Sequence, residues 1–329
     1  MTDAPLWITE AEVSALVSLP EAIDALERIL ALEARGEAEN MPKTHLMVGD
    51  NDAMHALGAS VAGAGICGFK TWVNVGGKSA TVVVLFSLED GACLAVIEAT
   101  ALGQMRTAAM TGVGTRRLAA EDAEVMAIVG SGKQALPQVA ACAAVRPLKT
   151  LRVYSRTPES RDRFAEAVRA AFDFEVIAAE SLQEAVRDAS IVTLITNSTG
   201  AFISNDLLSP GTHVNAMGAI VPARVEFTND VFPRCDVIAV DSLRGVQDLS
   251  AEFRSYFGDD ESGWRHVRPV SSLIAENVRR PAGADLTLFK AMGMGISDLA
   301  LAIEILERAR GAGRGHAVPA RVRTPPRLR

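Results

Sequence analysis

The chain has 329 residues, of which 49% are hydrophobic and 22% are charged, a composition typical of a globular protein and a length that suggests two domains. Its formal net charge of −7 argues against the basic surface of a nucleic-acid-binding protein. The N-terminal residues show no basic segment followed by an apolar run, and no apolar run reaches the roughly 18 residues of a membrane span. We therefore expect a cytoplasmic protein with neither a membrane nor a nucleic-acid partner.

The four cysteines lie far apart and form no Cys-x-x-Cys pair, and the five histidines show no His-x-x-x-His spacing. We expect buried thiols in a reducing compartment and no metal site.

The first third of the chain predicts a helical region followed by a sheet. Residues 8–36 have helical spacing of apolar side chains, with Pro20 and Glu21 at a helix start and an end near Gly36. Short β-type runs separated by turn sequences follow between residues 44 and 98, which predicts an antiparallel sheet. A helix rich in small residues is then expected at 100–119.

From about residue 120 the pattern alternates between strand and helix. Strands are predicted at 125–130, 150–155, 175–179, 191–196, 212–218 and 236–242, and helices at 133–145, 157–172 and 181–189, the last with a Ser181/Glu184 capping box. Such alternation predicts an α/β fold with a doubly wound parallel sheet, as in a Rossmann domain. A last helix is expected at 297–310, and the arginine-rich residues 311–329 are expected to be disordered.

The stretch "AIVGSGKQALPQ" (127–138) contains a Gly-x-Gly-x-x-Ala turn between a predicted strand and a predicted helix. In this context Gly130 allows a tight turn, Gly132 lets a pyrophosphate approach the backbone, and Ala135 lets the helix pack on the strand. The N–H groups at the helix start, including those of Ser131, Lys133 and Gln134, would face the phosphates. A purely structural turn is the alternative.

The second strand of this unit ends in Ser155, Arg156 and Thr157, with no acidic residue before Glu159. An acid at this place would bind the ribose 2′-hydroxyl of NAD, whereas a guanidinium and two hydroxyls suit the 2′-phosphate of NADP. We therefore expect NADP(H) to be preferred and NAD(H) to be possible. Arg156 as an ordinary solvated arginine is the alternative.

Several segments together resemble the ornithine cyclodeaminase/mu-crystallin family. These segments are "GFKTWVN" (68–74), "LEDGACLAVIEATALGQMRTAA" (88–109), "VGSGKQA" (129–135), "VYSRTPE" (153–159), "VNAMGAIVPARVEF" (214–227) and "TLFKAMGMGISDLA" (287–300). The resemblance implies a discontinuous α+β substrate-binding and dimerisation domain, residues 1–117 plus 297–329, and a dinucleotide-binding domain, residues 118–296. It also implies a homodimer and a small imino or amino acid substrate.

The resemblance implies that Lys70 and Arg106 bind the substrate carboxylate and carry the catalysis. The physical argument is independent, because a charged group among small apolar residues needs an anionic partner. A snorkelling lysine and an internal salt bridge of Arg106 are the alternatives.

Lys43 stands near the place where the cyclodeaminases carry a further carboxylate-binding arginine, and a lysine weakens that contact. His45 beside it is a candidate substrate ligand or proton donor, or a structural histidine.

Four further positions are expected at the cofactor. Thr196 and Asn197 follow a predicted strand, where they line the cofactor crevice or merely form a turn, and Met217 and Gly218 lie in the resembling segment 214–227. His55 and His213 are expected to be structural, and Asp298 to be a first-turn acid at the last helix or a residue near the site.

Residue 220 separates the candidate functions. The cyclodeaminases carry an aspartate there that handles the amine of ornithine, whereas this chain has Ile220, which cannot accept a proton. We therefore favour an NAD(P)H-dependent imino-acid reductase, reversibly an L-amino-acid dehydrogenase, with Ile220 as an apolar wall against the substrate. An ornithine cyclodeaminase whose acid is Glu226 or Asp298, and a non-catalytic crystallin-like binding protein, are the alternatives.

Overall fold

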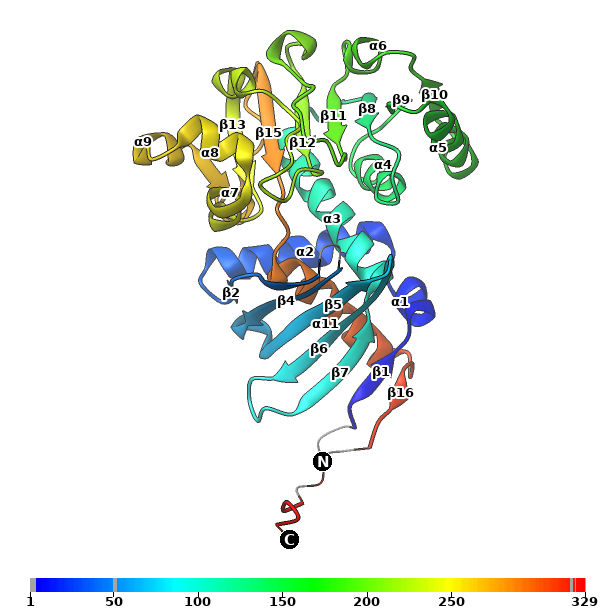
Figure 1. Ribbon diagram of the computed structural model, residues 1–329, viewed down its shortest axis with the longest axis vertical. Coiled ribbons are helices and arrows are strands. Elements are labelled where there is room, and N and C mark those ends of the chain that lie inside the picture. Colours follow the sequence, from blue (N-terminus) through cyan, green and yellow to red (C-terminus); the bar gives the residue numbers. More distant parts are fainter. Residues whose placement is uncertain (1–3, 50–51, 320–321, 323, 329) are drawn as a thin grey trace.

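The computed structural model of the protein describes residues 4–49, 52–319, 322 and 324–328. These residues form two β-sheets that lie one above the other in Figure 1, with one helix, α3 (Thr100–Leu118), running between them. The predicted helix at 100–119 is thereby confirmed.

In the described residues the first sheet has eight strands and is mostly antiparallel. Its order is β16 (His316–Ala317), β1 (Leu6–Ile8), β7 (Cys93–Glu98), β6 (Lys78–Ser87), β5 (Ile66–Val75), β4 (Asp52–Val61) and β2 (Ala38–Asn40), with β3 (Thr44–Val48) also paired to β4. The antiparallel sheet predicted between residues 44 and 98 is confirmed. The sequence pattern missed β1, which pairs in parallel with β7.

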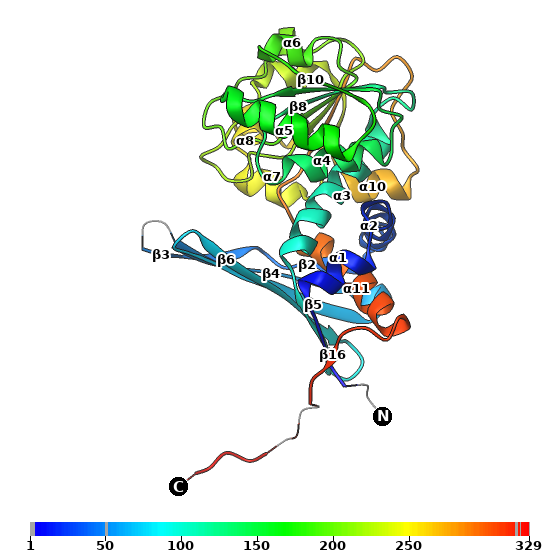
Figure 2. The same cartoon turned by 90° about the vertical axis from the view of Figure 1, so that its right-hand side faces the viewer.

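The predicted helical region 8–36 consists of two helices, α1 (Glu10–Leu16) and α2 (Leu19–Ala34). The break has a local cause, because each helix has its own N-cap residue, Thr9 and Ser18. The last helix, α11 (Gly295–Gly311), starts two residues before its predicted start and lies along one face of the first sheet (Figure 2).

The prediction of a disordered segment from residue 311 is wrong for its first part. The strand β16 pairs antiparallel with β1, and the Val318 N–H donates to the Pro5 carbonyl at 2.8 Å. The Gly315 N–H also donates to the Glu12 carboxylate at 2.8 Å. Backbone pairing and the Glu12 carboxylate therefore hold residues 315–318 against the edge of the sheet, whereas residues 320, 321, 323 and 329 lie outside the described part.

The second sheet is parallel throughout, which confirms the predicted α/β class. Its order is β10 (Glu175–Ala178), β9 (Thr150–Tyr154), β8 (Val125–Val129), β11 (Ile191–Leu194), β12 (His213–Ala216), β15 (Leu286–Lys290), β13 (Cys235–Val240) and β14 (Val267–Pro269). The strand order reverses between β8 and β11, which is the switch point at which doubly wound sheets bind ligands.

Seven helices accompany this sheet. They are α4 (Ala135–Ala143), α5 (Pro158–Ala171), α6 (Leu182–Val186), α7 (Leu243–Leu249), α8 (Ala251–Phe257), α9 (Glu261–Trp264) and α10 (Val270–Ala275). The sequence pattern missed α7 to α10 together with β14 and β15. It also predicted α6 too long. Only half of the predicted capping box forms: the Ser181 hydroxyl accepts from the Glu184 N–H, but the Glu184 carboxylate accepts from the Glu180 N–H and not from that of Ser181.

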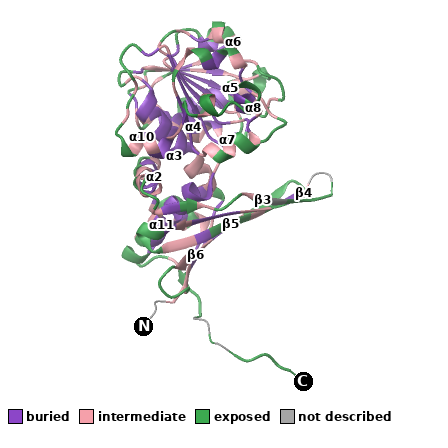
Figure 3. Cartoon of the chain, turned by 90° about the vertical axis from the view of Figure 1, so that its left-hand side faces the viewer, coloured by how far each residue is buried: buried purple, intermediate pink, exposed green. Residues whose placement is uncertain are grey.

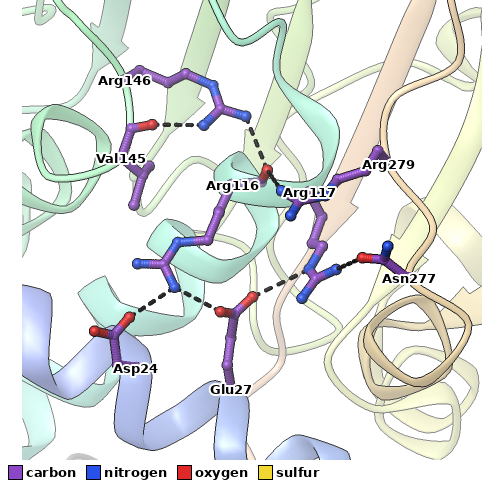
Figure 4. Close-up of polar contacts among 8 residues, drawn as sticks. All are labelled: Asp24, Glu27, Arg116, Arg117, Val145, Arg146, Asn277 and Arg279. Atoms are coloured by element: carbon purple, nitrogen blue, oxygen red, sulfur yellow. Dashed lines mark hydrogen bonds and ion pairs between the residues drawn. The ribbon is translucent and has the colours of Figure 1, made fainter.

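The C-terminal end of α3 is held by arginine side chains from neighbouring elements (Figure 4). Arg146 donates from Nη2 to the carbonyls of Thr115, Arg116 and Ala119, each at 2.9 Å, and from Nε to that of Ala120 at 2.7 Å. These carbonyls include some that a helix end leaves without intrahelical partners. Arg146 thus fixes one end of the helix that joins the two sheets.

Replacing Arg146 with methionine should destabilise the protein by about 3 kcal/mol, because the buried carbonyls lose four hydrogen bonds to a charged donor. Urea denaturation measures the change. Arg28→Ala is the control, because this arginine pairs with Glu304 through a side chain that is 60% exposed and should contribute less than about 1 kcal/mol. Equal losses in the two variants would contradict the proposed anchoring of α3.

Candidate active site

The glycine-rich turn follows β8 and leads into α4. Gly130 has a φ of +116°, and a Cβ there would lie 2.4 Å from the Ile195 carbonyl oxygen, so only glycine fits this turn. A Cβ on Gly132 would meet no atom within 4 Å, so its backbone is open to close approach by a ligand. Ala135 is fully buried at the first position of α4.

A cavity of about 400 Å³ lies between this turn and the end of β9. Its wall includes Ser155 and Arg156, and Ser155 also contacts Ser131 through their hydroxyls at 3.1 Å. Arg156 is exposed and forms no ion pair with any of the described residues. Thr157 is the N-cap residue of α5 and is not among the residues that line the cavity.

A second cavity, of about 280 Å³, continues from the first toward α3. Gly132, Ile195, Thr196 and Asn197 line both cavities, so the two form one groove across the carboxyl ends of the parallel strands. The other lining residues of the second cavity are Arg106, Thr107, Met110, Lys133, Gln134, Met217, Gly218, Ile220, Asp241, Ala291, Met292 and Gly293. All residues predicted at the cofactor line the groove except Ala135 and Thr157.

Glu226 holds the two loops that form the middle of this groove. Its Oε1 accepts from the N–H and hydroxyl of Thr196 at 2.7 and 2.8 Å, and its Oε2 accepts from the N–H groups of Gly218 and Ala219 at 2.9 and 3.1 Å. A carboxylate with four donors in a buried position acts as a structural anchor. This role differs from the proton-handling role considered for Glu226 in the sequence analysis.

A cationic cluster lies at the α3 end of the groove. Lys70 Nζ of β5 lies 2.8 Å from Asp298 Oδ1 of α11, and Arg106 Nε of α3 lies 3.1 Å from the same oxygen. Asp298 is fully buried, and its Oδ2 has no hydrogen-bond partner within the described residues. Asp298 is therefore the internal anionic partner of both predicted catalytic cations, as in the salt-bridge alternative for Arg106.

Lys43 and Trp72 complete this cluster. Lys70 Nζ lies 4.8 Å and Lys43 Nζ 6.0 Å from the centre of the Trp72 ring. Burial, followed by repulsion from Arg106, lowers the pKa of Lys70 to about 8 and also lowers that of Lys43. Three cations thus surround one carboxylate, which leaves an excess of positive charge for an anionic ligand.

The predicted histidines are placed as follows. His45 lies in β3, but its side chain is outside the described part of the structure. His55 stacks on Trp72 with ring centres 4.5 Å apart. His213 is fully buried, and burial lowers its pKa to about 3, so it is neutral at physiological pH. The structural assignments of His55 and His213 agree with these positions.

Two acidic residues near the cluster were not recognised in the sequence. Asp241, at the end of β13, is buried in the cavity wall and accepts from the N–H groups of Met292 and Gly293 at 2.9 and 2.7 Å. Burial raises its pKa. Glu33 of α2 accepts from the Asn40 amide at 3.3 Å, and burial, together with the nearby Asp241 charge, raises its pKa to about 7. Of these two acids, only Asp241 could have been found from the sequence, because it lies at the end of a predicted strand.

In the described ranges no three His, Cys, Asp or Glu side chains come together in a way that could hold a metal ion. Among the helices that the structure describes, none is long and apolar enough to cross a lipid bilayer.

Comparison with known proteins adds a family and several relatives. The model of the ornithine cyclodeaminase/mu-crystallin family matches residues 5–313. A Δ1-pyrroline-2-carboxylate reductase of Bacillus cereus is 28% identical over 239 residues, which cover 72% of this chain and 73% of the relative.

Two solved structures resemble the whole fold. The Δ1-pyrroline-2-carboxylate reductase of Thermococcus litoralis, in complex with NADH and L-proline, is 25% identical, with a TM-score of 0.87 and coverage of 95% of this chain and 100% of that chain. An archaeal alanine dehydrogenase dimer with bound NAD is also 25% identical, with a TM-score of 0.87 and coverage of 96% and 99%.

Replacing Glu33 with glutamine should change stability in a pH-dependent way. Because the pKa is raised from 4.5 to about 7, stability is lost as the pH rises through this window and remains lower above it. At pH 8 the variant should therefore be more stable than the wild type by about 1–2 kcal/mol, whereas at pH 5 it should gain little. Denaturation at both pH values measures this, with the exposed Glu39→Gln as control. A gain of equal size at both pH values would contradict the raised pKa.

Proposed function

The chain belongs to the ornithine cyclodeaminase/mu-crystallin family, and on this basis we propose that it is an NAD(P)H-dependent imino-acid reductase, reversibly an L-amino-acid dehydrogenase. The observation that carries the proposal is the continuous groove, which runs from the glycine-rich turn at Gly132 to the guanidinium of Arg106. Such a groove suits a dinucleotide whose reactive end meets a small acid at the cationic cluster.

The groove residues fit a nicotinamide dinucleotide. The open backbone at Gly132 and the N–H groups at the start of α4 suit a pyrophosphate. Ser155 and Arg156 suit the 2′-phosphate of NADP(H), which we propose as the preferred cofactor, with NAD(H) accepted. When bound, the reduced nicotinamide supplies a hydride to the imine carbon.

The substrate carboxylate would bind to Arg106 and Lys70, with Lys43 adding long-range attraction. Asp298 keeps Lys70 and Arg106 in place by contacting both. With a pKa of about 8, Lys70 retains most of its positive charge at neutral pH. Ile220, Met110 and Met292 give the cavity an apolar wall, which favours a substrate with a small or apolar side chain.

A cyclodeaminase is the second candidate, because a carboxylate, Asp241, lines the same cavity as Ile220. Incubation with L-ornithine and a catalytic amount of NAD separates the two functions. A cyclodeaminase releases proline and ammonia without net consumption of cofactor, whereas the proposed reductase does not.

Oxidation of NADPH and NADH should be observed with an imino acid from a panel of 2-oxo acids plus ammonia or methylamine and preformed cyclic imines such as Δ1-pyrroline-2-carboxylate. Arg106→Leu should lower kcat/KM by about a hundredfold or more, because the carboxylate loses a charged hydrogen-bonding partner. Leu88→Glu, an exposed substitution in a turn of the first sheet, is the control. If no member of the panel is reduced, the proposed function is wrong, and the result favours a non-catalytic binding protein.

Cofactor preference has its own test in Arg156→Ala. We expect the Kd for NADPH to rise by about tenfold or more while the Kd for NADH changes little, because only NADPH carries the 2′-phosphate. Isothermal titration calorimetry measures both constants. Equal changes for the two cofactors would refute the assignment.

We also propose that residues 1–117 and 297–329 form a substrate-binding and dimerisation domain, that residues 118–296 form the dinucleotide-binding domain, and that the protein is a homodimer. Exposed residues occur along β3 to β6 of the first sheet (Figure 3), and the strand register places apolar ones on the face opposite Lys70. They are Leu46, Val48, Met54, Phe69, Val73 and Val75. An apolar face of this kind supports association with a second copy, as does the dimeric relative.

The wild-type protein should have twice the mass of one chain in solution, and Val73→Glu should shift it toward the monomer. A charge in the centre of the apolar face would otherwise be buried without a partner. Light scattering coupled to gel filtration measures the mass, with Leu88→Glu again as control. A wild-type monomer would contradict the homodimer.

A further inference from the structure

The buried carboxylate of Asp241 is not explained by the contacts around it. It is 2% exposed, and its oxygens accept from the neutral backbone N–H groups of Met292 and Gly293, with the Ser242 backbone as a further donor. Within the described residues no lysine, arginine or histidine lies close enough to form an ion pair with it. A buried carboxylate without a cationic partner is costly.

The position of Asp241 relative to Arg106 suggests what its partner is. A Cβ on Gly293 would lie 3.2 Å from Arg106 Nη1, and the N–H of the same glycine donates to Asp241 at 2.7 Å. Both side chains line the cavity. The cavity wall therefore presents a cation and an anion that both lie close to Gly293, a charge pattern that matches an α-amino acid, with its carboxylate and its cationic nitrogen.

We propose that Asp241 contacts the cationic nitrogen of the bound imino or amino acid, while Arg106 and Lys70 hold its carboxylate. This inference rests on the proposed function and makes the substrate class more specific, to acids with a charged α-nitrogen. Met292, Gly293 and Ser242 supply three backbone donors to this carboxylate, which has about four acceptor sites, so one acceptor site is left for such a nitrogen.

The groups that face Asp241 are consistent with this role. Arg106 is the nearby cation, although it forms no ion pair with Asp241. The backbone donors come from residues 242, 292 and 293, and Glu33 is the nearby acid. Because the other carboxylate of the cluster, Asp298, already contacts Lys70 and Arg106, Asp241 is the acid left for the nitrogen.

Two pairs of ligands isolate the nitrogen contact. L-proline and cyclopentanecarboxylate share a ring and a carboxylate but differ in the nitrogen, as do L-alanine and propanoate in an open chain. Calorimetric Kd values in the presence of saturating oxidised cofactor give the preference for nitrogen within each pair. We expect the wild type to bind the nitrogen-bearing member of at least one pair about tenfold or more tightly.

In Asp241→Asn we expect this preference to fall below about threefold, with little change in the Kd of the nitrogen-free acid or of the cofactor. Asp298→Asn is the matched control, and it should change both members of a pair by the same factor, because Asp298 contacts only the carboxylate-binding cations. A preference that persists in Asp241→Asn, or a variant that loses the cofactor instead, would overturn the inference.

The wild-type measurements stand even if Asp241→Asn does not fold. A wild type that binds both members of each pair equally well overturns the role of Asp241 while leaving the carboxylate site intact. A wild type that binds none of the four acids overturns the proposed function itself, and the inference with it.

Discussion

The site depends on the buried carboxylate of Asp298, which contacts both Lys70 and Arg106. Lys70 comes from a strand of the first sheet, Arg106 from the connecting helix and Asp298 from the last helix of the fold. The positive charges of Lys70 and Arg106, which contact the same oxygen of Asp298, repel one another in this buried site. Burial by itself also lowers the pKa of Lys70. Asp298 offsets this repulsion by contacting both cations, so that they are held in place before a ligand arrives.

The helix that carries Arg106 is fixed to the parallel sheet by a buried chain of polar contacts. Thr115 accepts from the Asn215 amide at 3.0 Å, and Asn215 contacts His213, which in turn contacts Thr287, each at 3.0 Å. Because His213 is neutral, this chain consists of uncharged hydrogen bonds in the core. The parallel sheet thereby fixes the position of Arg106 in the groove. The positions of Lys70 and Asp298 are instead fixed by the first sheet and by α11.

Much of the architecture could be predicted from the sequence because its signals are local. The turn at Gly130–Gly132 and the alternation of strands and helices depend on neighbouring residues, and the structure confirms the doubly wound sheet that they predict. The strand β15 was missed since its segment, next to glycine and methionine, gives a short apolar run without periodicity. The helices between residues 243 and 275 are short, so their patterns were too weak to detect.

The candidate site was harder to predict, because its partners are distant in sequence. Lys70 and Arg106 stood out as charges among small apolar residues, but nothing in the sequence could assign Asp298 to both of them. Glu226 was considered as an acid for catalysis, and the structure instead gives it four donors from the loops of the groove. Asp241 was not singled out from the sequence, and its burial without an ion-pair partner is what the structure adds.

The pairing of β16 with β1 brings the N-terminal residues 5–8 and the C-terminal residues 316–318 side by side, with a hydrogen bond from the Val318 N–H to the Pro5 carbonyl. Both ends lie at the margin of the first sheet, on the far side of the molecule from the parallel sheet and its groove (Figure 1). A short peptide could therefore join them, so that new ends opened in a surface loop would give a circularly permuted protein with the same layers. Fusion partners or immobilisation handles attached at this margin would likewise leave access to the groove unobstructed.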